Sequence, residues 1–232
     1  MRHIRSKLSI PFLLAGSLLL GGCPFMASPT AVVVTTPAAM TVVQGNGQTA
    51  QAGRLLATMI VLRVVDANGH GVAKQVATFV VAAGGGSVDP ATAATDSSGE
   101  VRVKWTLGSA SPLQSLVAKV NETIGATINA TGTFPTDIVV AQGAGQSGKI
   151  VTVLKNDIVI RVVGAGNAPM IGIPVSFKVT AGGGGLSPQS GVTNAQGELA
   201  TKWTMGSAAG VNSIDVSSGN LTPATVSATA LP

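Results

Sequence analysis

Few side chains in this sequence could do acid–base or nucleophilic chemistry. The chain has 2 histidines, 9 acidic residues, a single cysteine and no tyrosine. His70 stands between Gly69 and Gly71, in a segment that the glycines mark as a turn. A Ser–His–Asp triad would need this histidine as its general base. A loop histidine between two glycines is typical of a solvated side chain, so the sequence predicts a protein that is not an enzyme.

The acidic residues are dispersed along the chain, although carboxylates distant in sequence could still meet in space. Asp96 is the best candidate for an acid–base or calcium-binding role, because it stands just before the predicted turn at Ser98 and Gly99. In the corresponding place later in the chain the residue is Asn194. Both aspartate and asparagine favour turns without any metal. We therefore predict no metal site and no cofactor.

One glycine-rich segment resembles a phosphate-binding loop. It runs from Gly143 to Lys149 and matches the spacing G-x-G-x-x-G. A true loop of this kind needs serine or threonine after the lysine and a helix whose N-terminus faces the phosphate. Here Ile150 follows, and the apolar run 151–154 predicts a strand. The segment is interpreted as a turn.

Two other features could contact a ligand. The run Gly84–Gly86 would allow close approach of a bound molecule, but glycine also suits a tight turn or bulge between strands. Trp105 and Trp203 could form a platform for a sugar if they were exposed. Trp105 alternates with Arg102 and Lys104, which predicts an inward side chain. We expect turns and core residues at these places.

Cys23 is the residue with the clearest predicted chemistry. A short basic start is followed by the apolar stretch 8–20, about 13 residues long, which fits a secretory signal and is short for a membrane span. The stretch ends in Leu20-Gly21-Gly22-Cys23, which resembles the lipobox of bacterial lipoproteins. That resemblance implies cleavage before Cys23, lipid on its thiol and anchoring to a membrane. Pro24 follows in place of an acidic retention residue, which favours the outer membrane.

The charge of the chain does not indicate a nucleic-acid partner. The formal net charge is +5, but three of the 14 basic residues precede the predicted cleavage site, which leaves 11 against 9 acidic ones, a net of +2. The remaining basic residues are spread singly, whereas nucleic-acid binding needs a clustered basic face. A single cysteine also cannot form an intrachain disulfide, so the fold must rest on its apolar core.

Most of the chain is a tandem repeat. Residues 35–132 return as residues 133–230, shifted by 98 positions, so that Gly99–Ala110 corresponds to Gly197–Ala208. A repeat of about 100 residues is a whole domain, not a unit of a solenoid. The protein therefore contains two copies of one small domain.

Both copies show the alternation of β-strands. In the segment 100–107 the residues Val101, Val103, Trp105 and Leu107 share one face. The segments around Ile60–Val64 and Ala77–Val81 alternate likewise, as do their copies. Glycine-rich turns separate them. Short strands with one wet face predict an antiparallel sandwich of about seven strands in each copy.

This order of motifs resembles the bacterial immunoglobulin-like domains of group 1, the modules of invasin- and intimin-type adhesins. The motifs that carry the resemblance are Phe79, Gly84–Gly86, Thr95-Asp96 before Gly99, and Trp105–Gly108, and each returns in the second copy. The resemblance implies a disulfide-free immunoglobulin-like sandwich and a part in adhesion. The barrel anchor and receptor-binding tip of those adhesins have no counterpart here; lipid on Cys23 would replace the barrel.

The sequence thus predicts an all-β chain with two tandem immunoglobulin-like antiparallel β-sandwiches after a lipoprotein signal peptide. The predicted division is 1–22 signal peptide, 23–36 lipidated tether, 37–132 first domain and 133–232 second domain. We expect an exported, lipid-anchored protein of the outer membrane, on its surface or its periplasmic face. The expected role is surface adhesion or spacing, with a protein or glycan partner. The alternative is an accessory lipoprotein of a larger envelope complex.

Overall fold

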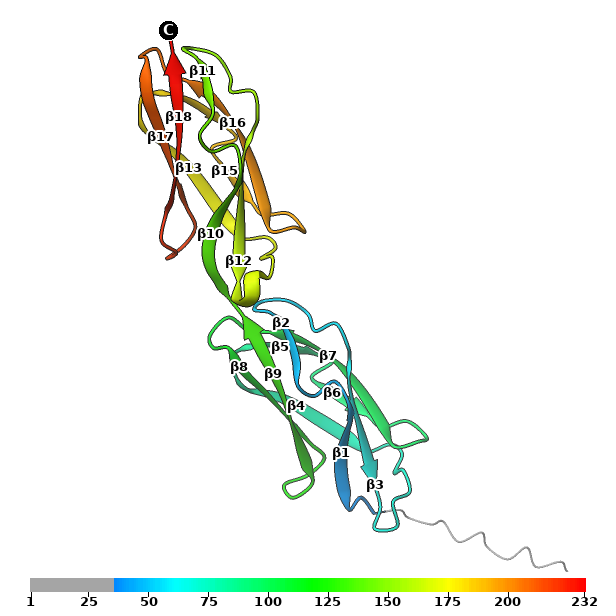
Figure 1. Cartoon of the computed structure of the whole chain (residues 1–232). Coiled ribbons are helices and arrows are strands. Elements are labelled where there is room, and N and C mark those ends of the chain that lie inside the picture. Colours follow the sequence, from blue (N-terminus) through cyan, green and yellow to red (C-terminus); the bar gives the residue numbers. More distant parts are fainter. Residues whose placement is uncertain (1–35) are drawn as a thin grey trace, which may run out of the picture. The chain divides into compact units, whose positions relative to one another are not determined.

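The computed structural model describes residues 36–232, which form two β-sandwiches in succession along the chain (Figure 1). Each sandwich has nine strands, and the described residues contain no helix except the 3₁₀ turn Ala165–Asn167. The all-β sandwiches expected from the alternating strands are confirmed, as is the immunoglobulin-like class that the resemblance implied.

The first sandwich packs a four-stranded sheet, in the order β1-β3-β7-β5, on a five-stranded sheet, in the order β2-β9-β8-β4-β6. Its pairs are antiparallel except for the short parallel pair β2–β9. The strands are β1 Ala39–Gln44, β2 Gln48–Gln51, β3 Ile60–Val65, β4 Val76–Ala83, β5 Gly86–Asp89, β6 Thr92–Ala94, β7 Glu100–Leu107, β8 Leu113–Lys119 and β9 Gly125–Thr133.

The second sandwich repeats this topology, with sheets β10-β12-β16-β14 and β11-β18-β17-β13-β15. Its short parallel pair is β11–β18. The strands are β10 Pro135–Gln142, β11 Ser147–Lys149, β12 Ile158–Gly164, β13 Pro174–Ala181, β14 Gly184–Ser187, β15 Ser190–Val192, β16 Glu198–Met205, β17 Gly210–Ser217 and β18 Ala224–Leu231.

The strand count exceeds the seven expected from the sequence. The three shortest strands of the first sandwich, β2, β5 and β6, have only three or four residues each and account for the higher count. So few residues show no clear alternation of apolar and polar side chains, and their pairing comes from the neighbouring longer strand.

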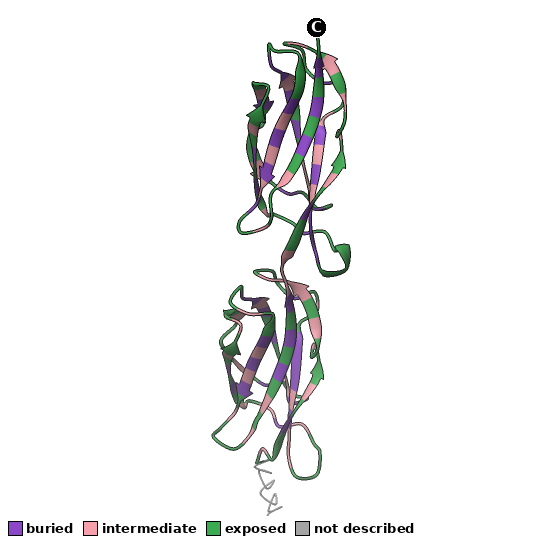
Figure 2. Ribbon diagram, turned by 60° about the vertical axis from the view of Figure 1, so that its left-hand side comes forward, coloured by how far each residue is buried: buried purple, intermediate pink, exposed green. Residues whose placement is uncertain are grey.

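Each sandwich has its own apolar core, made by the inward faces of its two sheets (Figure 2). In β7 the predicted inward residues Val101, Val103, Trp105 and Leu107 are all buried. In β16 a polar residue, Thr201, occupies one of the inward positions and is buried, and its hydroxyl donates to the Pro188 carbonyl at 2.7 Å. That bond satisfies the hydroxyl inside the core.

Candidate functional site

The structure places His70 where it is solvated. Its side chain is 76% exposed in the turn between β3 and β4, with Nδ1 3.5 Å from Oδ2 of Asp66. Oδ1 of Asp66 accepts the backbone N–H groups of Asn68 and His70, each at 2.9 Å. The N–H of His70 is the largest cause that lowers the pKa of Asp66. This aspartate therefore stabilises the turn, and the pair does not resemble a catalytic dyad.

Asp96 stabilises a second turn in the same way. Its Oδ1 accepts the hydroxyl of Ser98 at 2.6 Å and the backbone N–H groups of Ser98 and Glu100 at 2.9 Å. These bonds, the Ser98 hydroxyl foremost, lower the pKa of Asp96 to about 2. Asn194 accepts the same two backbone bonds in the second sandwich, at 2.9 Å each.

Turn geometry therefore explains both Asp96 and its counterpart Asn194 without a metal ion. Within residues 36–232 no three histidine, cysteine, aspartate or glutamate side chains gather closely enough to hold one.

The segment that resembles a phosphate-binding loop is a turn followed by a short strand. Gly143 and Gly145 have φ angles of 93° and 70°, and Ser147–Lys149 form β11. The strand expected over 151–154 is absent, because the chain turns at Val151, whose φ is 59°. No helix follows the lysine in this segment, so the backbone lacks the N–H groups that would bind phosphate.

The glycine run Gly84–Gly86 is required by its own backbone conformation and by the close approach of a neighbouring strand. Gly84, Gly85 and Gly86 all have positive φ, between 74° and 95°. A Cβ atom on Gly86 would lie 2.2 Å from the carbonyl oxygen of Thr106. The close approach is thus between β5 and β7, as expected of a turn between strands, and leaves no need for a ligand.

Both tryptophans belong to the cores. Trp105 is 1% exposed and Trp203 is 0% exposed. Neither indole can therefore serve as a sugar platform on the surface, which confirms the interpretation from strand alternation. Their Nε1 atoms have no hydrogen-bond partner within residues 36–232.

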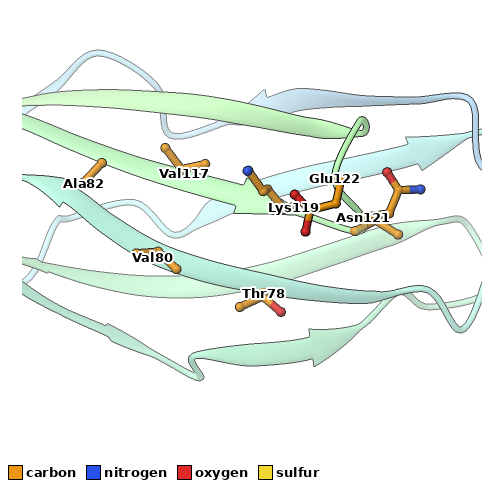
Figure 3. Close-up of a pocket in the computed structure, with 8 residues that line it drawn as sticks. Thr78, Val80, Ala82, Val117, Lys119, Asn121 and Glu122 are labelled. Carbon is orange, nitrogen blue, oxygen red and sulfur yellow. The ribbon is translucent and has the colours of Figure 1, made fainter.

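The candidate binding surface is a groove on the outer face of the first sandwich, which we call the β4–β8 groove. It has a volume of 480 Å³ and is lined by Thr78, Val80, Ala82, Val117, Lys119, Val120, Asn121 and Glu122. Figure 3 shows the aliphatic side chains along β4 and β8, with Lys119, Asn121 and Glu122 gathered at one end.

Strand alternation assigns Val80 to the outer face but gives it no role. Val80 is 57% exposed and Val76, on the same face of β4, is 58% exposed. An aliphatic stripe on the solvent side of a sheet is the feature that simple alternation misses. A signal was present in the repeat itself, because the second copy has Lys178 where the first has Val80.

Comparisons with known proteins identify no family for this chain. No protein-family model matches the sequence, and no curated protein matches it. Among solved structures, the adhesin InvE of Yersinia pseudotuberculosis matches with 18% identity and a TM-score of 0.44 over 83% of this chain. Invasin, described as a bacterial integrin-binding protein, matches with 20% identity and a TM-score of 0.44 over 83% of this chain.

A β-glycosidase of Bacteroides vulgatus also matches, with 11% identity and a TM-score of 0.36 over 84% of this chain. This chain spans 59% of InvE, 40% of invasin and 25% of the glycosidase. The function is therefore argued from the surface of this chain.

Cys23 and the predicted signal peptide lie outside the described residues. Among residues 36–232 there is no helix of the length and hydropathy that a membrane crossing requires.

Proposed function

We propose that this chain is a non-enzymatic, lipid-anchored protein of the bacterial cell envelope. Its two immunoglobulin-like sandwiches would act as an adhesion or spacer module at the surface. In this proposal residues 1–22 are the signal peptide, Cys23 carries the lipid, 23–36 form the tether, and 37–132 and 133–232 are the two domains.

The proposal of a non-enzymatic role rests on the hydrogen bonds that the polar side chains make within their own turns. Asp66, Asp96 and Asn194 are engaged by the turns they cap, and the one histidine of the described chain is solvated. Within residues 36–232 no three histidine, cysteine, aspartate or glutamate side chains gather as a metal site would require. The recessed surface that combines exposed aliphatic and charged groups, the β4–β8 groove, suits a protein partner better than a small substrate.

The alternative is an accessory lipoprotein that faces the periplasm and supports a larger complex. The open edges of the sheets favour it, because β1 and β5 each have a strand neighbour on one side alone. Such an edge can accept a strand from a partner by backbone hydrogen bonds.

Two measurements test these proposals. Cys23→Ser should move the chain from the membrane to the soluble fraction and remove the mass of the lipid; an unchanged mass and fractionation would exclude lipid anchoring. Protease treatment of intact cells, compared with lysed cells, then locates the domains. Loss from intact cells supports the adhesion role, and protection until lysis supports the periplasmic alternative.

A further inference from the structure

The outer faces of the two sandwiches differ in a way that the shared fold does not require. On β4 and β8 of the first sandwich, Val80 lies directly opposite Val117. At the same place on β13 and β17 of the second sandwich, Lys178 lies opposite Asp215. Since both pairs occupy the same position of the same fold, the valine pair is not needed for folding.

The second sandwich uses this face for hydrogen bonds within its own sheet. The hydroxyls of Ser176 and Ser217 are 2.8 Å apart, and those of Thr180 and Ser213 are 3.0 Å apart. The hydroxyl of Thr225 donates to Asp215 at 2.8 Å. This face is polar, and its hydroxyl and carboxyl groups are hydrogen-bonded to one another, so water can cover it at little cost.

The first sandwich has aliphatic side chains at three of the corresponding positions, while Thr78, Ser115, Lys119 and Thr127 remain polar. Thr180 of the second copy is replaced by Ala82, and the Lys178–Asp215 pair by Val80 and Val117. Val80 is 57% exposed, and together with Val76 it continues the aliphatic surface along β4. Apolar surface gathered on one face of a soluble domain is typical of a contact surface.

The groove also presents opposite charges at one end. Lys119 and Glu122 line it beside Asn121 (Figure 3), and neither forms an ion pair with any residue in the range 36–232. A partner that covers the aliphatic floor must therefore offer a negative and a positive group at this end. The surface of this chain offers both, which makes a second copy complementary to the first.

We propose that the β4–β8 groove is the surface through which two copies of this chain associate. A two-fold axis along the strands, between β4 and β8, places Val80 of each copy over Val117 of the other, as the symmetry of an isologous contact demands. The same axis keeps the charged ends together. Lys119 of each copy can then pair with Glu122 of the other, so that the two ion pairs form at one end of the contact. The proposal does not depend on the lipid anchor.

Thiol cross-linking of the full chain in the cells that express it tests the association. Val117→Cys should produce a dimer of this chain when a bis-maleimide is added, because the proposed axis places the two copies of position 117 diagonally across the contact, within reach of such a reagent although too far apart for a direct disulfide. Asp215→Cys, at the matching position of the second sandwich, is the control and should produce about ten-fold less dimer. The chain without an added cysteine measures any cross-link through Cys23.

Charge variants in the Val117→Cys background test the pairing of copies. Lys119→Glu and Glu122→Lys should each lower the dimer yield about ten-fold, because each places like charges across the contact. The double variant restores opposite charges between identical copies and should return the yield to within about two-fold of the parent. Val80→Lys should also abolish the dimer, and its fold is expected to survive because the second sandwich already has Lys178 there.

Equal cross-linking at 117 and 215, or no dimer at either, would overturn the proposal. A cross-link from position 117 to a different protein would overturn it as well, since another partner would then occupy the groove. Failure of the double charge variant to recover would argue against contact between identical copies. None of these outcomes depends on whether Cys23 carries lipid, which is tested separately by fractionation.

Discussion

Oδ2 of Asp96 lies 3.3 Å from Nη1 of Arg102, two strand positions beyond the turn that the aspartate caps. The other guanidinium nitrogen of Arg102 contacts Glu100, at 2.5 Å. One carboxylate oxygen of Asp96 thus binds the turn, and the other contacts Arg102 near the start of β7. The second sandwich preserves the turn with Asn194 but has Ala200 in place of Arg102, so the charge is particular to the first copy.

Asp96 should make the stability of the first sandwich depend on pH in the acid range. Its pKa in the folded chain is about 2, below its ordinary value of 3.8, so the folded state favours the ionised form. The resulting stabilisation is complete above about pH 4 and is lost as the pH falls through about 2. Asp96→Asn should lack this dependence while it keeps the two backbone bonds, as Asn194 does.

The measurement is the midpoint of thermal unfolding between pH 2 and pH 6 for the parent and for Asp96→Asn. The difference between the two should be largest at pH 5–6 and should shrink toward pH 2. A difference that stays constant over this range would show that ionised Asp96 does not stabilise the fold. Asp137→Asn, at a carboxyl outside these turns, serves as the control.

Truncation of either core tryptophan should destabilise its own sandwich strongly. Trp105 and Trp203 are almost completely buried, and replacement of such a side chain by alanine costs about 3–5 kcal/mol. Phenylalanine keeps most of the apolar volume and also removes an indole N–H that has no partner within residues 36–232, so its cost should be clearly smaller.

Urea unfolding, followed by tryptophan fluorescence, measures these effects one sandwich at a time. The chain has 2 tryptophans, one in each core, so Trp105→Phe leaves Trp203 as the reporter of the second sandwich. If Trp203→Ala and Trp203→Phe proved equally destabilising by circular dichroism, the packing argument would be wrong.

Two adjacent glycines of β14 should respond oppositely to substitution by alanine. At Gly184 the φ is 95°, and an added Cβ would lie 2.1 Å from the carbonyl oxygen of Thr204. Gly184→Ala should therefore cost at least about 1–3 kcal/mol. At Gly185 an added Cβ meets no atom within 4 Å, and the first copy has Ser87 there, so Gly185→Ala should be neutral or slightly stabilising.

Chemical denaturation of both variants in the Trp105→Phe background would compare them directly. Equal free energies of unfolding for the two variants would contradict the close approach of β14 to β16.

Replacement of Gln114 should lower the free energy of unfolding, because its side-chain amide is buried and hydrogen-bonded to the backbone. Its Oε1 accepts the N–H of Gly108 at 3.0 Å, and its Nε2 donates to the carbonyl of Gly108 at 3.4 Å. Gln114→Met keeps the length of the side chain but leaves both backbone groups of Gly108 unpaired, at a cost of about 1–3 kcal/mol. Gln44→Met, at an exposed residue of β1, is the matched control and should change the free energy of unfolding by less than about 0.5 kcal/mol.

The sequence by itself determined the repeat, the strand class and the inward faces. Strict alternation at Val101–Leu107 identified a half-buried strand because successive side chains of a strand point to opposite faces. The same alternation excluded Trp105 from the surface. The turn residues Asp96 and Asn194 were also readable, because their side chains bond to backbone groups only a few residues away.

Tertiary structure decided what depends on pairing between distant segments. The short strands β2, β5 and β6 exist because longer strands provide their hydrogen-bond partners, and Val151 turns where its sequence favours a strand. The opposition of Val80 and Val117 comes from the register of two strands that the chain joins only after some thirty residues. An exposed aliphatic groove is thus a property of the assembled sheet, since neither strand alone reveals which side chains its neighbour will leave uncovered.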